Sequence, residues 1–203
     1  MVFRAVVMST LLYASETWTL YRPDLRSLEC FQQQKLRQIL GIRWESHTTN
    51  IEVLQRASAK SVKACIAQHR LRWAGHILRM EDTRLPKIML FGELANGSRP
   101  RGRPKLRYRD QLKSTLNAAG IGHRSWEETA RDRPAWRRAV RDGASIIELN
   151  RVWKEEERRR ERRERLRQPP PQPTIPCPHC RRLFPHRMGL DSHISYKHPQ
   201  LAR

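Results

Sequence analysis

Two cysteines and two histidines near the end of the chain constrain its folding more than any other feature. Two residues separate Cys177 from Cys180, twelve separate Cys180 from His193, and four separate His193 from His198. This spacing allows two thiolates and two imidazoles to surround one zinc ion tetrahedrally. Four protein ligands leave no open position for water, so we predict one structural Zn²⁺ and no metal catalysis. The alternative is that four metal-capable residues stand there by chance.

Apolar residues in the same segment lie at regular intervals from these ligands. Three residues separate Cys180 from Phe184, and two separate Leu190 from His193. Residues 177–198 therefore resemble the two-cysteine, two-histidine zinc fingers, which fold as a ββα unit. The resemblance implies a miniature core of Phe184, Leu190 and an apolar residue such as Ile175. So small a unit depends on its metal, because zinc ligation contributes about 10–16 kcal/mol of apparent folding energy.

In that family, side chains at the start of the helix meet the edges of bases in nucleic acid. The matching positions here are His186, Gly189 and Ser192, and we add Arg187 to the predicted nucleic-acid contacts. Gly189 offers no side chain, and one finger spans only about three base pairs, so we expect weak sequence preference. The alternative is a finger that binds protein or only stabilises a terminus.

The charge balance indicates a polyanionic partner for the rest of the chain. It holds 41 Lys and Arg against 20 Asp and Glu, a net charge of +21. Phosphate backbones favour such charge by releasing condensed counterions, so we expect salt-dependent binding to RNA, DNA or both. A merely solvated basic surface is the alternative. A protein partner stays open, and the sequence does not indicate an oligomeric state.

The number of cysteines and the hydropathy of the chain indicate the cellular compartment in which we expect the protein. Cys30 and Cys65 are solitary, which predicts a reducing environment and no disulfide framework. The run AVVMSTLLYA after Arg4 is apolar enough to imitate a signal peptide, and no segment is long enough to span a membrane. We therefore expect a nuclear or cytoplasmic protein that is neither secreted nor membrane-bound.

The remaining sequence predicts a mainly α fold with a small helical body. Apolar periodicity indicates helices over 23–40, 61–80 and 106–118, and capping boxes begin at Thr49 and Ser125. Residues 86–94 are compatible with a strand or an extended segment, and the pattern does not decide between them. We expect a helical region over 1–95, a basic loop over 96–105, a helical region over 106–150, a charged helix over 151–168, a proline-rich linker over 169–176 and the finger over 177–198.

Histidines and tryptophans within these helices are expected to pack. His69 and His76 lack an accompanying acid or cysteine constellation, so packing or surface roles are favoured over ligation. Trp126, Trp136 and Trp153 are predicted to lie between helices instead of forming an exposed platform for bases.

The loop before residue 106 is rich in arginine, glycine and proline. Pro100–Pro104 reads Pro-Arg-Gly-Arg-Pro and resembles the core of an AT-hook, which places arginines in the narrow minor groove of A·T-rich DNA. A basic turn leading into the next helix is the alternative. The predicted nucleic-acid contacts of this region are Arg99, Arg101, Arg103, Lys105 and Arg107.

Several segments carry a wider family resemblance. These are LLYASETW (11–18), LRQILGIRW (36–44), RLRWAGHILRM (70–80), RGRPKLRYRDQLK (101–113) and RDRPAWRRAV (131–140). They resemble the thumb and C-terminal region of reverse transcriptases from non-LTR (LINE-type) retrotransposons, as does a terminal finger with a Met-Gly-Leu step. The polymerases of that family hold two magnesium ions with paired aspartates, and this chain has no adjacent aspartate pair. We therefore expect a non-catalytic fragment.

Three functions follow from these observations. The leading interpretation is a zinc-binding, nucleic-acid-binding fragment of a retrotransposon reverse transcriptase. A protein-interaction module with a zinc finger, or a non-functional retroelement relic, is the alternative. An enzyme is the third class, although we find no residues to carry out its chemistry.

Overall fold

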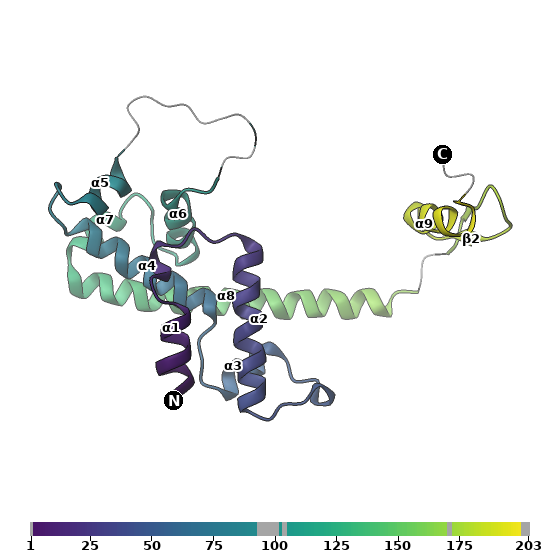
Figure 1. Cartoon of the computed structure of the whole chain (residues 1–203), viewed down its shortest axis with the longest axis horizontal. Coiled ribbons are helices and arrows are strands. Elements are labelled where there is room, and N and C mark those ends of the chain that lie inside the picture. Colours follow the sequence, from purple (N-terminus) through teal and green to yellow (C-terminus); the bar gives the residue numbers. More distant parts are fainter. Residues whose placement is uncertain (1, 93–101, 103–104, 170–171, 200–203) are drawn as a thin grey trace. The chain divides into compact units, whose positions relative to one another are not determined.

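The computed structural model describes residues 2–92, 102, 105–169 and 172–199. The described chain is mainly α-helical, as the sequence predicts, with one small two-stranded sheet near its end (Figure 1). Its contacts divide it into two units, Met1–Lys154 and Glu155–Arg203. The first unit is a helical body, and the second contains the metal-ligand candidates.

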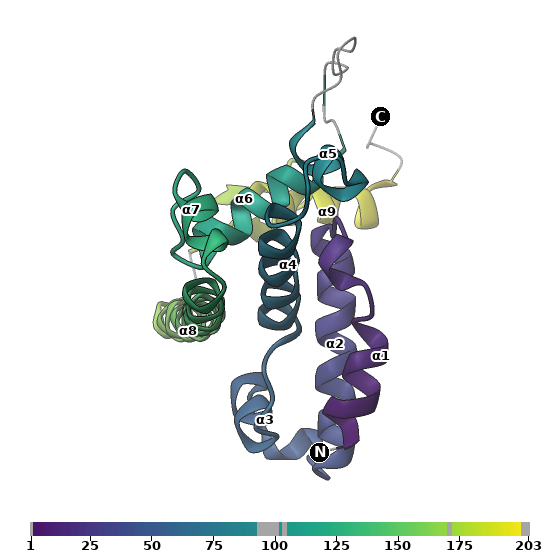
Figure 2. The same cartoon turned by 90° about the vertical axis from the view of Figure 1, so that its left-hand side faces the viewer.

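The body begins with a π-helical segment, Phe3–Met8, that continues into α1 (Ser9–Leu11). A short 3-10 turn follows at Ser15–Thr17, and α2 spans Arg22–Ile39. The N-terminus of α2 is fixed by the Asp24 carboxylate, which accepts a hydrogen bond from the Tyr21 amide at 3.0 Å. The axes of the N-terminal helical segment and of α2 are roughly parallel in Figure 2, and Met8 and Leu12 pack against Val62 and Ile66.

Helix α3 (Asn50–Arg56) begins at the first predicted capping box, which is confirmed. The Glu52 amide donates to Thr49 Oγ1 at 3.2 Å, and the Thr49 amide donates to Glu52 Oε2 at 3.2 Å. The helix packs Val53 and Leu54 onto Leu36 of α2. Local hydrogen bonds and apolar burial therefore agree on where this helix starts.

Helix α4 (Val62–Leu78) packs against α2 and against later helices of the body. Nine of its residues are buried, among them Ala64, Leu71 and Ala74 with no exposed surface. His69 does pack within the body, because its Nδ1 lies 2.8 Å from Ser15 Oγ. His76 is exposed beside Trp73, with 5.4 Å between the ring centroids.

Arg70 of α4 is buried without a carboxylate partner among the described residues. Its guanidinium donates to Thr115 Oγ1 at 2.9 Å, to the Trp18 carbonyl at 2.9 Å and to Gln111 Oε1 at 2.8 Å. Burial lowers the pKa of Arg70, and the nearby Tyr108 counteracts that effect. The side chain thereby joins α4 to the segment before α2 and to α6 (Tyr108–Ala118).

The expectation of a strand or an extended segment over 86–94 is wrong where the structure describes it, because residues 85–91 are helical. Helix α5 spans Leu85–Phe91, and Pro86 stands in its first turn, where a proline suits the start of a helix. Helix α7 spans Trp126–Arg131. The capping box predicted at Ser125 is wrong, because Ser125 has helical backbone angles and its side chain does not cap the helix.

Helix α8 is continuous over Arg133–Arg167, so the predicted boundary at residue 150 does not interrupt the helix. Trp126 and Trp136 are buried as predicted, with 5.9 Å between their ring centroids. The prediction for Trp153 is wrong, because it is 59% exposed. Leu149, four residues earlier on α8, is 69% exposed as well, so this apolar face of the helix lies at the surface.

Two glycines permit close packing around α8. Trp136 Nε1 donates to the Leu71 carbonyl of α4 at 3.0 Å, and a Cβ on Gly75 would lie only 2.1 Å from that nitrogen. On α8 itself, a Cβ on Gly143 would lie 2.7 Å from the Cβ of Ala119. Both positions therefore exclude larger side chains.

The second unit ends in a short ββα arrangement. Strands β1 (Ile175–Pro176) and β2 (Leu183–Phe184) are antiparallel, and Ile175 pairs with Phe184. Helix α9 spans Arg187–Lys197. Of the helices described, none is long and apolar enough to cross a membrane.

Candidate metal centre

The strands place both cysteines of the candidate site. Cys177 follows β1 directly, and its amide donates to the Arg182 carbonyl at 2.9 Å, which closes the turn around Cys180. Cys177 is 5% exposed, and Cys180 is partly buried. The short two-residue separation therefore brings the two sulfur atoms to the same side of the turn.

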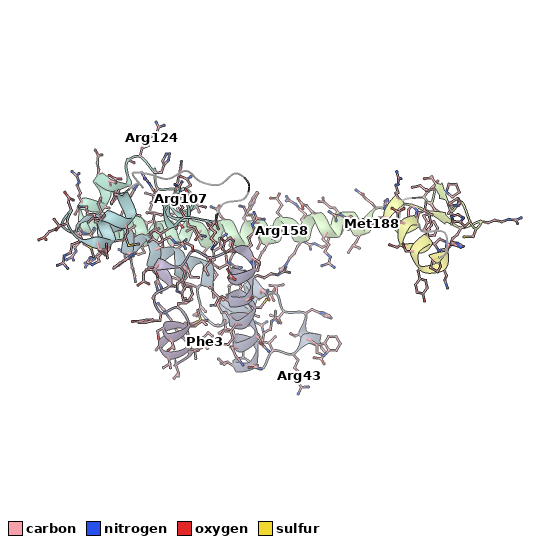
Figure 3. The ribbon with its side chains drawn as sticks, turned by 45° about the horizontal axis from the view of Figure 1, so that its top comes forward. Phe3, Arg43, Arg107, Arg124, Arg158 and Met188 are labelled. Atoms are coloured by element: carbon pink, nitrogen blue, oxygen red, sulfur yellow. The ribbon has the colours of Figure 1, made fainter. Side chains whose placement is uncertain are left out.

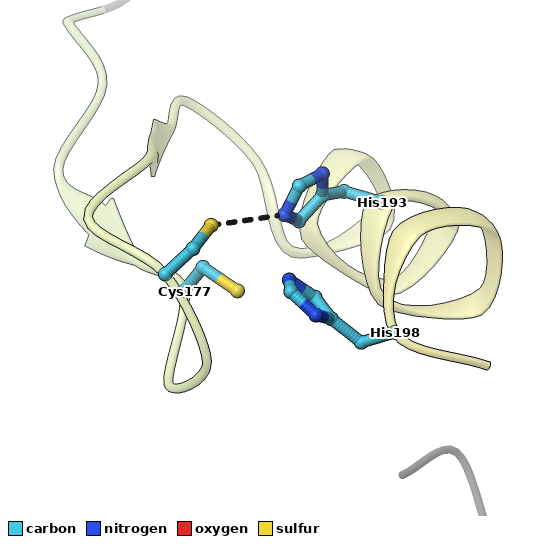
Figure 4. Close-up of side chains that lie close together, drawn as sticks. Cys177, His193 and His198 are labelled. Atoms are coloured by element: carbon cyan, nitrogen blue, oxygen red, sulfur yellow. Dashed lines mark hydrogen bonds between the residues drawn. The ribbon is translucent and has the colours of Figure 1, made fainter. Parts of the chain in front are cut away.

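The C-terminal part of α9 supplies the two histidines. His193 lies within the helix, and His198 follows its last residue, where the His198 amide donates to the Ile194 carbonyl at 2.8 Å. Figure 4 shows both imidazoles facing the cysteine side chains. Sequence spacing predicted this convergence, and the structure brings all four side chains together.

The distances suit one tetrahedral metal ion. The four ligand atoms all lie within 4.8 Å of one another. Cys180 Sγ and His193 Nε2 are 3.3 Å apart, the contact that is dashed in Figure 4. A tetrahedral zinc site with ordinary bond lengths has a sulfur-to-nitrogen edge of about 3.6 Å. The four residues are therefore close enough to hold one metal ion.

An unpartnered nitrogen supports the same conclusion. His198 Nε2 is buried and has no hydrogen-bond partner among the described residues. A buried polar atom without a partner is costly, and coordination to a metal satisfies it. The His193 and His198 rings pack edge to face at 5.2 Å, which holds both imidazoles at the centre.

The surroundings favour the protonation states that metal ligands need. Burial raises the pKa of the Cys177 thiol, but hydrogen bonds from the His179 and Cys180 amides and from the Cys180 side chain outweigh it, so that pKa is lowered. Burial also lowers the pKa of His193, as do the neighbouring charges of His198, Arg182 and Lys197. Thiolate and neutral imidazole are the ligating forms.

Two residues predicted for the miniature core, Phe184 and Ile175, lie together beside the ligands. Phe184 stacks near His193, with 4.7 Å between the ring centroids, and Ile175 pairs with Phe184 across the strands. Ile175, Phe184 and Leu190 are each partly buried. Little apolar surface is buried here, so the unit depends on its ligands for stability.

The predicted nucleic-acid contacts lie at the surface where the structure describes them. His186, Arg187 and Ser192 are exposed at the start and middle of α9. Lys105 and Arg107 are exposed as well, and Arg107 Nε lies 3.1 Å from Asp110 Oδ2. Arg99, Arg101 and Arg103 lie outside the described residues. These contacts stay predictions.

The structure adds features that sequence reasoning missed. The His179 and Cys180 amides bond to the Cys177 sulfur, and the signal for this was the short spacing between the cysteines. Tyr196 is 78% exposed on α9, and the Lys197 ammonium lies 5.0 Å from its ring centroid. A single aromatic residue in a helical sequence does not by itself predict such an exposed position or its contact with a lysine.

Comparison with known proteins finds a distant relative. A Caenorhabditis elegans protein named as a transposon-derived protein is 26% identical over 148 residues, which cover 68% of this chain and 52% of the relative. The chain thus spans about half the length of that relative. No family model matches the sequence. No solved structure matches it either.

Proposed function

We propose that the chain is a retroelement-derived, zinc-stabilised protein that binds nucleic acid and has no catalytic activity of its own. The observation that carries the proposal is the convergence of Cys177, Cys180, His193 and His198 within a ββα unit. The transposon-derived relative and the net charge of +21 support it. In this proposal the chain corresponds to the C-terminal region of a non-LTR reverse transcriptase.

Zinc is the metal that best suits this set of donors. Two sulfur and two nitrogen donors in a tetrahedral arrangement favour zinc over hard cations, which prefer oxygen ligands. Four protein ligands close the coordination sphere, so the metal stabilises the fold and leaves no position for a reacting water. Thiolate ligands persist in reducing compartments, which supports a nuclear or cytoplasmic location.

Nucleic acid is the proposed partner because the chain has a large net positive charge of +21. Counterion release from a phosphate backbone lowers the logarithm of the association constant linearly with the logarithm of salt concentration. A chain with 41 basic residues should therefore bind RNA and DNA tightly in dilute salt and weakly in concentrated salt. The proposal does not assign a preference between RNA and DNA.

The test combines metal analysis with binding. The purified full chain should contain one zinc per molecule, and its affinity for labelled RNA and DNA oligonucleotides should fall steeply between 50 and 200 mM salt, by about 10³-fold or more. Affinity that does not change with salt would falsify nucleic-acid binding by charge. Incorporation of nucleotides on a primed template by the purified chain would contradict the non-catalytic assignment.

A protein-interaction role is the second candidate, and exposed apolar residues favour it. Met188 and Tyr196 of α9 are each 78% exposed. Exposed Met and Tyr side chains are common at protein interfaces. A partner that binds through these residues should resist added salt and competing nucleic acid, which separates this function from the first.

A further inference from the structure

A cleft of about 970 Å³ opens in the helical body, lined mainly by the N-terminal helical segment, α4 and the first turns of α8. Its floor is apolar and is formed by Met8, Leu12, Trp136 and Val140, each of which is at most 8% exposed. All lining residues belong to the first unit. Basic side chains surround this floor.

Most of the basic side chains form two rows along the cleft. Residues three or four apart on a helix lie on the same face with a rise of about 4.5–6 Å, so each row presents its basic side chains together. The rows are Arg72, His76 and Arg79 on α4, and Arg133, Arg137 and Arg141 on α8.

Arg79 of α4 lines the same cleft as Arg133 and Arg137 of α8. Burial lowers the pKa of Arg79, and the like charges of Arg133 and Arg137 lower it further. Arg79 is held by a hydrogen bond to the Ala130 carbonyl. Such crowding is unfavourable for the free protein, and an anion placed between the rows relieves it.

Negative side chains do not balance this charge. Neither aspartate nor glutamate lines the cleft within the described chain, and Glu16 borders only a smaller neighbouring pocket. Arg72, Arg133, Arg137 and Arg141 have no ion-pair partner among the described residues. Their charges are therefore available to an external anion.

We propose that this cleft, flanked by Arg72 and Arg79 of α4 and by Arg133, Arg137 and Arg141 of α8, binds the phosphate backbone of single-stranded nucleic acid. The proposal rests on the proposed function and assigns it a site that neither the finger nor the arginine-rich loop includes.

The dimensions favour a single strand over a duplex. The volume is at the upper end of the range of about 300–1,000 Å³ for ligand pockets, so a short length of one strand enters it. A duplex is a stiff rod that reaches only the rim. Trp136 is 2% exposed and offers no face for stacking, and Phe3, which also lines the cleft, is partly buried, so recognition rests mainly on charge.

The test replaces cleft arginines in the full chain and compares them with arginines elsewhere. The cleft variant carries Arg72→Gln, Arg137→Gln and Arg141→Gln. The control variant loses the same charge at Arg43, Arg124 and Arg138, which are exposed and do not line the cleft. Figure 3 shows Arg43 and Arg124 extending outward from the body. A third variant with lysine at the three cleft positions keeps the charge.

Affinity for a mixed-sequence single-stranded RNA is measured by fluorescence anisotropy across a salt series. Each phosphate contact contributes about 0.7 to the salt slope for a single strand, so the cleft variant should lose about 2 from the slope and about 100-fold in affinity at 0.1 M salt. The lysine variant should retain the slope, and the control should lose only a few-fold. Circular dichroism checks that all three variants keep the same helicity.

The outcomes separate this proposal from the proposed function. If the cleft variant and the control lose affinity equally while the unmodified chain binds RNA, the cleft assignment is overturned and nucleic-acid binding stands. If the unmodified chain does not bind RNA even in dilute salt, the proposed function is overturned with it. An equal loss on a duplex of the same sequence would contradict the assignment to a single strand.

Discussion

Gly75 of α4 leaves the space that the indole of Trp136 of α8 occupies. A Cβ at position 75 would lie 2.1 Å from Trp136 Nε1 and 2.5 Å from its Cδ1, far inside contact distance. The same indole donates a hydrogen bond to the Leu71 carbonyl at 3.0 Å, one turn earlier on α4. The pair therefore sets how closely the two helices approach.

Replacing Gly75 with alanine tests this contact. Alanine is favoured over glycine within a helix by about 1 kcal/mol, but overpacking a core costs about 1–3 kcal/mol and the Trp136 hydrogen bond is displaced as well. We expect the free energy of unfolding to fall by about 2 kcal/mol in urea denaturation. A neutral or stabilising Gly75→Ala would contradict the packing.

The buried Arg70 gives a second stability prediction. Arg70→Met keeps the apolar stem and removes the donors to Thr115, Gln111 and the Trp18 carbonyl. Hydrogen bonds from a charged group contribute about 1.5–3 kcal/mol, and the acceptors are left unsatisfied, so we expect a loss of about 3 kcal/mol. Arg72→Met on the exposed face of the same helix should change stability by less than about 0.5 kcal/mol. Similar losses in both variants would show that the buried network stabilises nothing.

Stability of the body should fall in mild acid because of His69. Burial lowers the pKa of His69 below its ordinary value of 6.5, although Glu16 counteracts this and Arg72 adds to it. As pH falls through 6.5 the unfolded chain binds a proton before the folded chain does, so the free energy of unfolding decreases. Unfolding in urea at pH 7.5 and 5.5 measures the difference.

A matched variant isolates that contribution. His69→Gln removes the titrating group and keeps a side chain that can bond to Ser15. The six tryptophans all precede residue 155, so their fluorescence reports on the body and not on the metal unit. If the free energy of unfolding of His69→Gln depended on pH as strongly as that of the unmodified chain, groups other than His69 would cause the loss of stability in acid.

Removing one sulfur ligand should unfold only the C-terminal unit. Cys180→Ser should abolish stoichiometric metal binding, because the remaining three donors no longer complete the site. The metal contributes most of the folding energy of so small a unit, so its amide protons should exchange freely after the substitution or after chelation. Hydrogen exchange followed by mass spectrometry resolves the segments. Loss of protection throughout the body would show that the two units are coupled.

The arginine-rich loop carries a prediction from sequence alone. Arg101→Ala together with Arg103→Ala should weaken binding to A·T-rich duplexes more than to G·C-rich ones if the loop inserts into a narrow minor groove. Competition assays with the two duplexes measure the ratio. An equal loss on both would indicate simple phosphate contacts and favour the alternative of a basic turn.

Sequence patterns predicted the local features well. The metal ligands were found because their spacing lies within one 22-residue segment, and α3 was placed by the reciprocal hydrogen bonds of Thr49 and Glu52. Both depend on residues close together in the chain. The apolar run that forms α5 was expected to be a strand or an extended segment, because it is too short for its period to indicate a helix.

Features assembled from distant parts of the chain were predicted poorly. Trp153 was expected to pack, but burial depends on which helix lies opposite, and its neighbours in sequence do not determine that. The basic cleft joins Arg72 to Arg137, and nothing in their local sequence shows that they meet. The regular spacing of Arg133, Arg137 and Arg141 was the one available signal.

The two tight contacts of α8 limit changes in chain length. Trp136 and Gly143 are seven residues apart, close to two full turns, so both point toward the same side of the helix. Inserting or deleting one residue between them would rotate one contact by about 100° relative to the other. A homologous chain that keeps both contacts must therefore avoid single-residue insertions and deletions in this interval, whereas substitutions at its exposed positions leave both contacts in place.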